Sequence, residues 1–218
     1  MALPTYLDLV NDVLIRMREP EVSSVSENTL SKLVGKLVND AKRQVEDAYD
    51  WNALTDTLIV DAVSNTYGYK LNGTDGRFKV IDVQDVTNKT FLQAIPTSQM
   101  SQLLLLNHAP SKPTFYNFNG IDVATGDTQV DIYPTPEVGT RMYFNLYIPQ
   151  NDLTGDTDKL LVPKEPVILG AYARALVERG EDGGLNSSEA YALFRSSLSD
   201  HIAIESSRFV EESAWEAV

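Results

Sequence analysis

The chain has 218 residues, 43% of them hydrophobic, and no cysteine, so it can bury a core, while disulfides and thiolate metal sites are excluded. Its 31 acidic and 18 basic residues give a net charge of −13, which disfavours a surface that grips a nucleic-acid backbone. A wall of this charge would let DNA pass without sticking, and solubility alone explains the charge equally well.

The N-terminal segment does not have the pattern of a secretory signal. Asp8 and Asp12 interrupt it, and the first basic residue is Arg16. No apolar run in the chain approaches the roughly 20 residues that a membrane-spanning helix needs. We therefore expect no membrane association.

Two helices are expected in the N-terminal quarter. Residues 5–18 place apolar side chains at helical spacing, and Thr5 with Asp8 three residues later resembles a capping box. Ser24 and Glu27 form a second such pair. They lead into an amphipathic stretch long enough for about seven helical turns.

The middle of the chain, residues 55–149, changes to the alternating pattern and the β-branched and aromatic composition of strands. Turn-forming sequences punctuate it at 72–76, 87–90, 118–120 and 125–127. These turns predict hairpins and hence antiparallel pairing. Residues 96–106 form an exception, which reads as one short helix capped by Thr97 or Ser98.

The last third is helical again. Pro166 lies in the first turn of a predicted helix that ends at Gly180, where glycine supplies a helix stop. Asn186 and Glu189 then begin a long final helix.

This order of elements predicts an α+β fold, in which the N- and C-terminal helix pairs pack as a helical bundle with an inserted antiparallel β region. The expected domains are a helical core domain of residues 1–54 and 163–218 and an inserted β domain of residues 55–162.

Carboxylates occur in two patterns that resemble catalytic or metal sites. Asp8 and Asp12 are one helical turn apart, a spacing that a solvated helix face also produces. A second cluster superficially resembles a calcium loop and consists of Asn151, Asp152, Asp156 and Asp158. It lacks the required glycine position and the closing glutamate, so a polar turn explains it better.

Other signals of catalysis are weak. The two histidines, His108 and His201, are far apart in sequence, and no nucleophile motif accompanies either. The glycine-rich segment 180–184 follows a helix and lacks the lysine and hydroxyl residue of a phosphate loop. We therefore expect no enzyme, with no catalytic residue, no metal and no cofactor.

Two segments carry a resemblance to a known family. DKLLVPKEPVILGAYARALVERGEDGG (158–184) resembles the C-terminal signature of podovirus head–tail adaptors of the tail tubular protein A-like family. YLDLVNDVLIRMREPEV (6–22) and VEDAYDWNAL (45–54) look like the N-terminal half of that family. The β region matches only in character.

The resemblance implies a structural protein of the virion of a short-tailed phage, synthesised in the host cytoplasm. Its members are expected to form a ring of twelve copies between the portal protein and the tail nozzle protein, through which genomic DNA passes without specific binding. Such a ring needs complementary surfaces that close on themselves.

On that interpretation, the C-terminal Phe209, Val210 and Trp215 are candidate partner-binding residues, because large apolar groups near a chain end often anchor a partner. They would equally well complete the packing of the last helix. Two other classes of function remain open, a monomeric binding module that uses its sheet as a platform and, with less support, a hydrolase.

Overall fold

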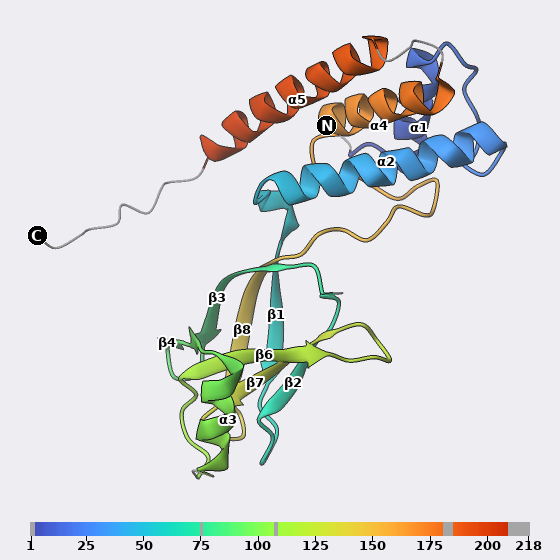
Figure 1. Ribbon diagram of the computed structural model, residues 1–218. Coiled ribbons are helices and arrows are strands. Elements are labelled where there is room, and N and C mark those ends of the chain that lie inside the picture. The colour runs from blue at the N-terminus through green and yellow to red at the C-terminus, as the bar shows by residue number, and fades with distance from the viewer. Residues whose placement is uncertain (1–2, 75, 107–108, 181–184, 209–218) are drawn as a thin grey trace, which may run out of the picture. The chain divides into compact units, whose positions relative to one another are not determined.

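The structure is a computed structural model that describes residues 3–74, 76–106, 109–180 and 185–208. It has an α+β fold, as the sequence predicts. The chain divides into two compact units (Figure 1). The helical unit comprises Met1–Leu54 and Gln150–Val218, and the β unit comprises Thr55–Pro149.

The first helix of the helical unit, α1 (Tyr6–Arg16), begins as predicted. The Thr5 hydroxyl accepts a hydrogen bond from the Asp8 backbone N–H at 3.2 Å, and the Thr5 N–H donates to the Asp8 carboxylate at 2.9 Å. The capping box is thereby confirmed.

The second helix, α2 (Thr29–Ala48), begins later than predicted. Asn28 is its cap and accepts a hydrogen bond from the Ser31 N–H at 2.8 Å. The proposed Ser24–Glu27 capping box is wrong, because the Glu27 carboxylate instead accepts hydrogen bonds from the N–H and hydroxyl of Ser23.

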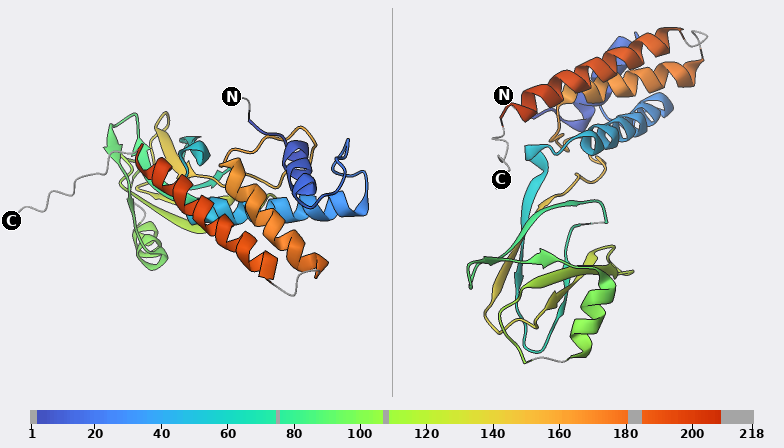
Figure 2. Two further views of the ribbon diagram at one scale, coloured as in Figure 1. Left: turned by 90° about the horizontal axis from the view of Figure 1, so that it is seen from above. Right: turned by 60° about the vertical axis from the view of Figure 1, so that its left-hand side comes forward.

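The C-terminal helices are α4 (Lys164–Arg179) and α5 (Leu185–Ser206). Helix α4 contacts α1, α2 and α5, and Figure 2 shows it between α2 and α5. Gly170 permits this close packing, since an added Cβ would lie 3.1 Å from the Phe194 ring and 3.2 Å from Ala41 Cβ. None of the helices in the described part of the chain combines the length and apolar content needed to cross a bilayer.

Residues 150–162, which the sequence places with the β domain, pack with the helical unit in the structure. Leu153, Leu160 and Val162 are buried in the helical core. The Tyr6 N–H donates to the Asp158 carbonyl oxygen at 2.7 Å. Because these apolar side chains are buried in the helical core, the boundary between the two units lies before this segment and not after it.

Polar side chains of α2 also fix this returning segment. The buried Lys42 ammonium pairs with Glu46 at 2.9 Å and donates to the Gln150 carbonyl oxygen at 2.5 Å. The Asn39 amide both donates to and accepts from the backbone of Leu153, at 3.0 and 2.9 Å. The entry of the chain into the helical unit is thus specified by hydrogen bonds as well as by packing.

The segment that resembles a calcium loop contains a tight turn held by Asp158. Its carboxylate accepts hydrogen bonds from the N–H groups of Thr154 at 2.8 Å and Gly155 at 2.7 Å. Both bonds lower the pKa of Asp158 from the ordinary value of 3.8, and the bond from Gly155 has the larger effect. The carboxylate therefore serves the backbone of its own turn.

We expect Asp158→Asn to lower the free energy of unfolding at neutral pH. Because the folded-state pKa is depressed, the contribution of the carboxylate is present above the unfolded pKa and is lost as the pH falls through the folded pKa. Urea unfolding of both proteins over a pH series measures this. If the difference in the free energy of unfolding between the two proteins stays constant when the pH falls below the folded-state pKa of Asp158, the role assigned to this carboxylate is wrong.

The β unit is built of two four-stranded sheets facing each other. The first sheet has the order β1-β8-β3-β4, and the second has the order β2-β7-β6-β5. The strands are β1 (Thr55–Asp61), β2 (Gly68–Leu71), β3 (Lys79–Asp85), β4 (Thr90–Phe91), β5 (Gln93–Ala94), β6 (Phe115–Ile121), β7 (Thr128–Tyr133) and β8 (Arg141–Tyr147). A 3-10 turn, η1 (Asn52–Leu54), precedes β1.

Side chains from the facing sheets form the core of the β unit. Val83, Met142 and Phe144 of the first sheet pack with Tyr116 and Ile132 of the second. In β8 buried residues alternate with exposed or half-buried ones, as the period of two in the sequence predicts, whereas β7 is buried at all but one of its positions.

The short helix α3 (Thr97–Leu105) packs on β6 and β7, on the outer face of the second sheet. Its N-cap is Pro96, without a side-chain cap, so the predicted cap at Thr97 or Ser98 is wrong. The Thr97 hydroxyl instead donates to the Asn117 side chain at 3.3 Å. Because α3 carries the chain back across the sheet, β5 pairs with β6 in parallel, an exception to the predicted antiparallel pairing.

Candidate interaction site

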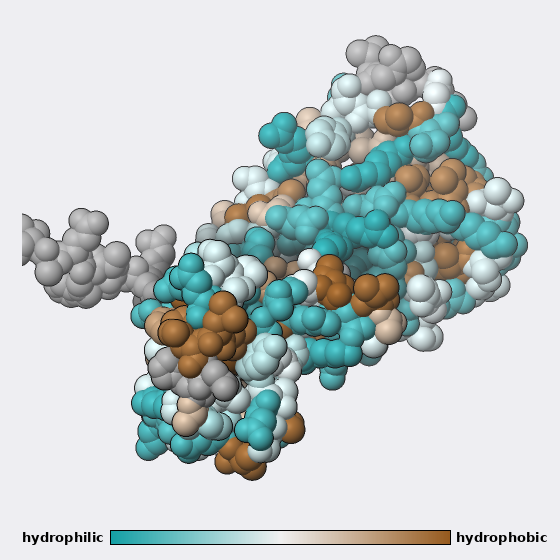
Figure 3. Space-filling view, turned by 60° about the horizontal axis from the view of Figure 1, so that its bottom comes forward, coloured by the Kyte–Doolittle hydropathy of each residue, from teal (hydrophilic) through white to brown (hydrophobic). Residues whose placement is uncertain are grey.

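Exposed apolar side chains occur on both units. Figure 3 shows them as separate patches on an otherwise largely polar face. In the β unit, Leu105 of α3 is 84% exposed. In the helical unit, Tyr191, Leu193 and Ile204 of α5 are exposed. Single exposed apolar residues are common, so a site has to be identified from a combination of shape and chemistry.

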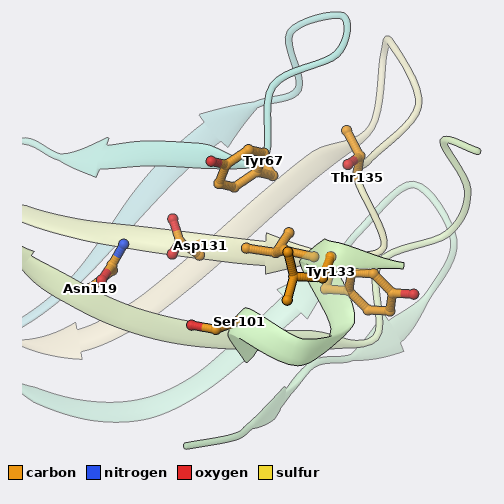
Figure 4. A pocket seen from close by; sticks show the side chains of 8 residues that line it. Tyr67, Ser101, Asn119, Asp131, Tyr133 and Thr135 are labelled. Carbon is orange, nitrogen blue, oxygen red and sulfur yellow. The ribbon is translucent and has the colours of Figure 1, made fainter. Parts of the chain in front are cut away.

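A pocket of about 520 Å³ lies in the β unit between α3 and the outer face of the second sheet (Figure 4). Its lining consists of Tyr67, Ser101, Leu104, Leu105, Asn119, Asp131, Tyr133 and Thr135. Four polar side chains and two aromatic rings therefore share a hollow with two leucines. The volume falls in the range of small-molecule and side-chain pockets.

The strand register places the polar groups of the pocket. Asp131 of β7 pairs with Asn117 of β6 on one side and with Gly68 of β2 on the other. Directly paired residues project from the same face of a sheet, so this row lies on the outer face. Gly68 leaves room beside the carboxylate, because an added Cβ would lie 3.3 Å from Asp131 Oδ1.

The Asp131 carboxylate is largely shielded from solvent, with the residue 7% exposed. This desolvation raises the pKa of Asp131, and a hydrogen bond with the Asn119 side chain opposes the rise. In the view of Figure 4 the carboxylate stands between Asn119 and the Tyr67 ring. No ion pair links Asp131 to a cation among the described residues.

Asn117 adds a further unsatisfied group to the same face. Its side-chain oxygen accepts the Thr97 hydroxyl at 3.3 Å, while its Nδ2 is buried without a hydrogen-bond partner among the described residues. Buried polar groups normally have partners. Two polar side chains under α3 thus keep unused hydrogen-bonding capacity.

The chemistry of this pocket suits binding better than catalysis. It presents one carboxylate, and neither a base–nucleophile pair nor an oxyanion hole is formed by its lining. Across the described ranges of the chain, no three histidine or carboxylate side chains are grouped closely enough to hold a metal ion. A polar or charged group with an apolar stem would match the lining.

A second hollow of about 620 Å³ lies in the helical unit. Among its lining residues, Asp152 pairs with Arg43 at 3.0 Å, and Asp156 accepts a hydrogen bond from the Val25 N–H at 3.0 Å. These carboxylates already stabilise the fold, so this hollow offers less to a ligand than the pocket under α3.

The exposed face of the first sheet carries a hydrogen-bonded row. The Thr57 hydroxyl donates to Asn145 at 2.6 Å, and Asn145 Nδ2 donates to Asp82 at 2.8 Å. Gln84 also donates to Asp82, at 2.9 Å. Ile59 follows Thr57 by two residues on β1, so its side chain projects from the same face, and it is 55% exposed. This face is the one that a platform-type binding module would use.

The predicted partner-binding residues Phe209, Val210 and Trp215 lie outside the described residues. His108 and residues 181–184 of the glycine-rich segment also lie outside them. His201 contacts the Ser197 carbonyl oxygen through Nδ1 at 2.7 Å within its own helix.

The other carboxylate pair, Asp8 and Asp12, has structural contacts. Asp8 completes the capping box of α1 by accepting a hydrogen bond from the Thr5 N–H, and Asp12 lies 3.8 Å from the Lys164 ammonium. The pocket under α3 was not predicted from the sequence. The sequence signal for it is a set of polar residues within predicted strands, with Asn117 and Asn119 two positions apart in one strand and Asp131 in the next.

Comparison with known proteins bears on the whole chain. A search of curated proteins finds no match. The sequence model of the SU10 adaptor protein family matches residues 4–212, a range that includes every described helix and strand. Because this match covers nearly the whole sequence, the chain belongs to the SU10 adaptor protein family and is a structural adaptor of a bacteriophage particle.

Proposed function

We propose that the chain is one copy of a closed ring, of twelve copies, that joins the portal protein to the tail nozzle protein of a short-tailed phage. The observation that carries this proposal is the match to the adaptor family over residues 4–212. The resemblance of the two helical segments to podovirus head–tail adaptors supports the ring and its position in the virion.

A ring of identical copies needs two different, complementary surfaces on each copy. Each of the two compact units has exposed apolar side chains that are not used in its own core. These side chains are available for contacts with other subunits. In the proposed particle these surfaces contact ring neighbours and the adjoining rings.

Genomic DNA passes through the ring without specific binding in this proposal. The net charge of −13, most of which falls on residues of the helical unit, is unfavourable for stable contacts with phosphates. Repulsion of like charges would keep the DNA mobile.

We also propose that Phe209, Val210 and Trp215 anchor the chain to the portal protein. Large aromatic and aliphatic side chains are well suited to filling pockets on a partner.

Association of the purified proteins tests these proposals. We expect the chain alone to be monomeric at low salt, because its acidic surface opposes self-association, and to form a stoichiometric ring when the portal protein is added. Native mass spectrometry measures both states. A variant truncated after Arg208 should fold and bind the portal more weakly.

Two results would contradict this account. A stable large ring of the isolated chain at low salt would show that the portal is not required. Failure to associate with the portal at any salt concentration would favour the alternative, a monomeric binding module that uses the exposed face of the first sheet. The hydrogen-bonded row of Thr57, Asn145 and Asp82 on that face supports this second candidate.

A further inference from the structure

We propose that the pocket under α3 binds a lysine or arginine side chain of a neighbouring protein. Three features of the β unit lead to this inference. They are the buried carboxylate, the apolar and aromatic walls, and the absence of a cation paired with the carboxylate among the described residues.

The carboxylate supplies the attraction. Asp131 is 7% exposed, and its one described hydrogen-bond partner is the neutral Asn119 side chain. Buried charges in proteins are normally paired with an opposite charge. A cation that enters the pocket would provide that charge and would find Asp131 already fixed by its neighbours on β6.

The walls select the kind of cation. Tyr67 and Tyr133 offer aromatic rings, and Leu104 and Leu105 offer apolar surface at the α3 side of the pocket. Lysine and arginine combine a charged head with an apolar stem, and both are attracted to aromatic faces. Leu105, at 84% exposed, is available to contact the stem or the surface from which it projects.

Other ligands fit less well. A divalent metal ion needs several oxygen ligands, whereas Asp131 is the single carboxylate in the lining. A phosphate or nucleic acid would be repelled by that carboxylate. The side-chain amide of Asn119 can orient a polar head but carries no charge.

The identity of the partner as a neighbouring virion protein rests on the proposed adaptor function. The binding of the cation to the pocket does not, because it can be measured on the isolated chain. Failure of the ring experiment and failure of the pocket experiment are therefore distinguishable.

The test uses the isotope-labelled full chain, titrated with N-acetyl-arginine methylamide and monitored by NMR. A parallel titration uses N-acetyl-citrulline methylamide, which has nearly the same shape and no charge. We expect saturable shifts at Tyr67, Asn119 and Asp131 with the arginine probe and at least tenfold weaker binding of the citrulline probe.

Substitutions assign the effect to the pocket. Asp131→Asn should weaken binding of the arginine probe at least tenfold. Asp56→Asn is the matched control, because it changes the net charge equally at an exposed position of β1, and it should bind as wild type does. If Asp131→Asn does not fold, Tyr67→Ser, which removes an exposed wall, should weaken binding severalfold.

Two outcomes would overturn the proposal. One is equal binding of the charged and neutral probes to the wild-type chain. The other is a folded Asp131→Asn variant, or failing that a Tyr67→Ser variant, that binds the arginine probe as tightly as wild type.

Discussion

Replacing Lys42 by methionine is expected to lower the free energy of unfolding of the helical unit by about 3–5 kcal/mol. The side chains of Lys42 and Glu46 are both fully buried. Removing the ammonium leaves the Glu46 carboxylate in the core without its cation. It also removes the hydrogen bond to the Gln150 carbonyl oxygen. Denaturant unfolding monitored by far-UV circular dichroism measures the loss.

Two variants separate the charge pair from the rest of the helix. Lys36→Met, at an exposed position of α2, should change stability by no more than about 0.5 kcal/mol. The double variant Lys42→Met with Glu46→Leu should recover much of the lost stability, because apolar residues can replace a buried pair at little cost. A single Lys42 variant as stable as wild type would show that the pair is not buried as described.

Trp51→Ala is expected to cost about 3–5 kcal/mol, since it removes a large buried side chain and leaves a cavity. Trp51 is 2% exposed and lies in the helical core. Its indole N–H donates to the Val45 carbonyl oxygen at 2.7 Å, and its ring meets Tyr49 edge to face. Thermal unfolding of the variant and of wild type gives the difference in stability.

Trp51→Phe is the matched variant, which keeps most of the buried ring and loses the indole hydrogen bond. We expect it to cost less than Trp51→Ala, by the part of the effect that comes from the cavity. Equal losses for the two variants would contradict the cavity argument and assign the effect to the hydrogen bond.

The features of the fold that the sequence predicted correctly depend on local rules. The Thr5–Asp8 capping box joins residues three positions apart, and Gly180 ends α4 in a left-handed conformation, with φ of 63°. The alternation of buried and more exposed residues in β8 is likewise a local pattern. Each of these patterns needs no knowledge of distant contacts.

The mispredicted features depend on competition between partners. Glu27 could have formed a capping box with Ser24 at the start of α2. Its carboxylate instead accepts a hydrogen bond from Ser23, and Asn28 caps the helix. The parallel pairing of β5 with β6 follows from the path of α3 across the sheet. Such choices are made between nearly equivalent local contacts, so spacing in the sequence does not distinguish them.

The candidate site could not be predicted because it is assembled from separate segments. Tyr67 precedes β2, Ser101 comes from α3, Asn119 from β6 and Asp131 from β7. The space beside the carboxylate depends on the missing side chain of Gly68. The partner-binding roles of the C-terminal apolar residues remain a prediction.

Electron cryo-microscopy of the neck of the virion tests the adaptor function most directly. We expect a closed ring of twelve copies of this chain between the portal and the nozzle, with the DNA path along its axis. A particle whose neck lacks the chain, or holds it as isolated copies that do not touch one another, would contradict it.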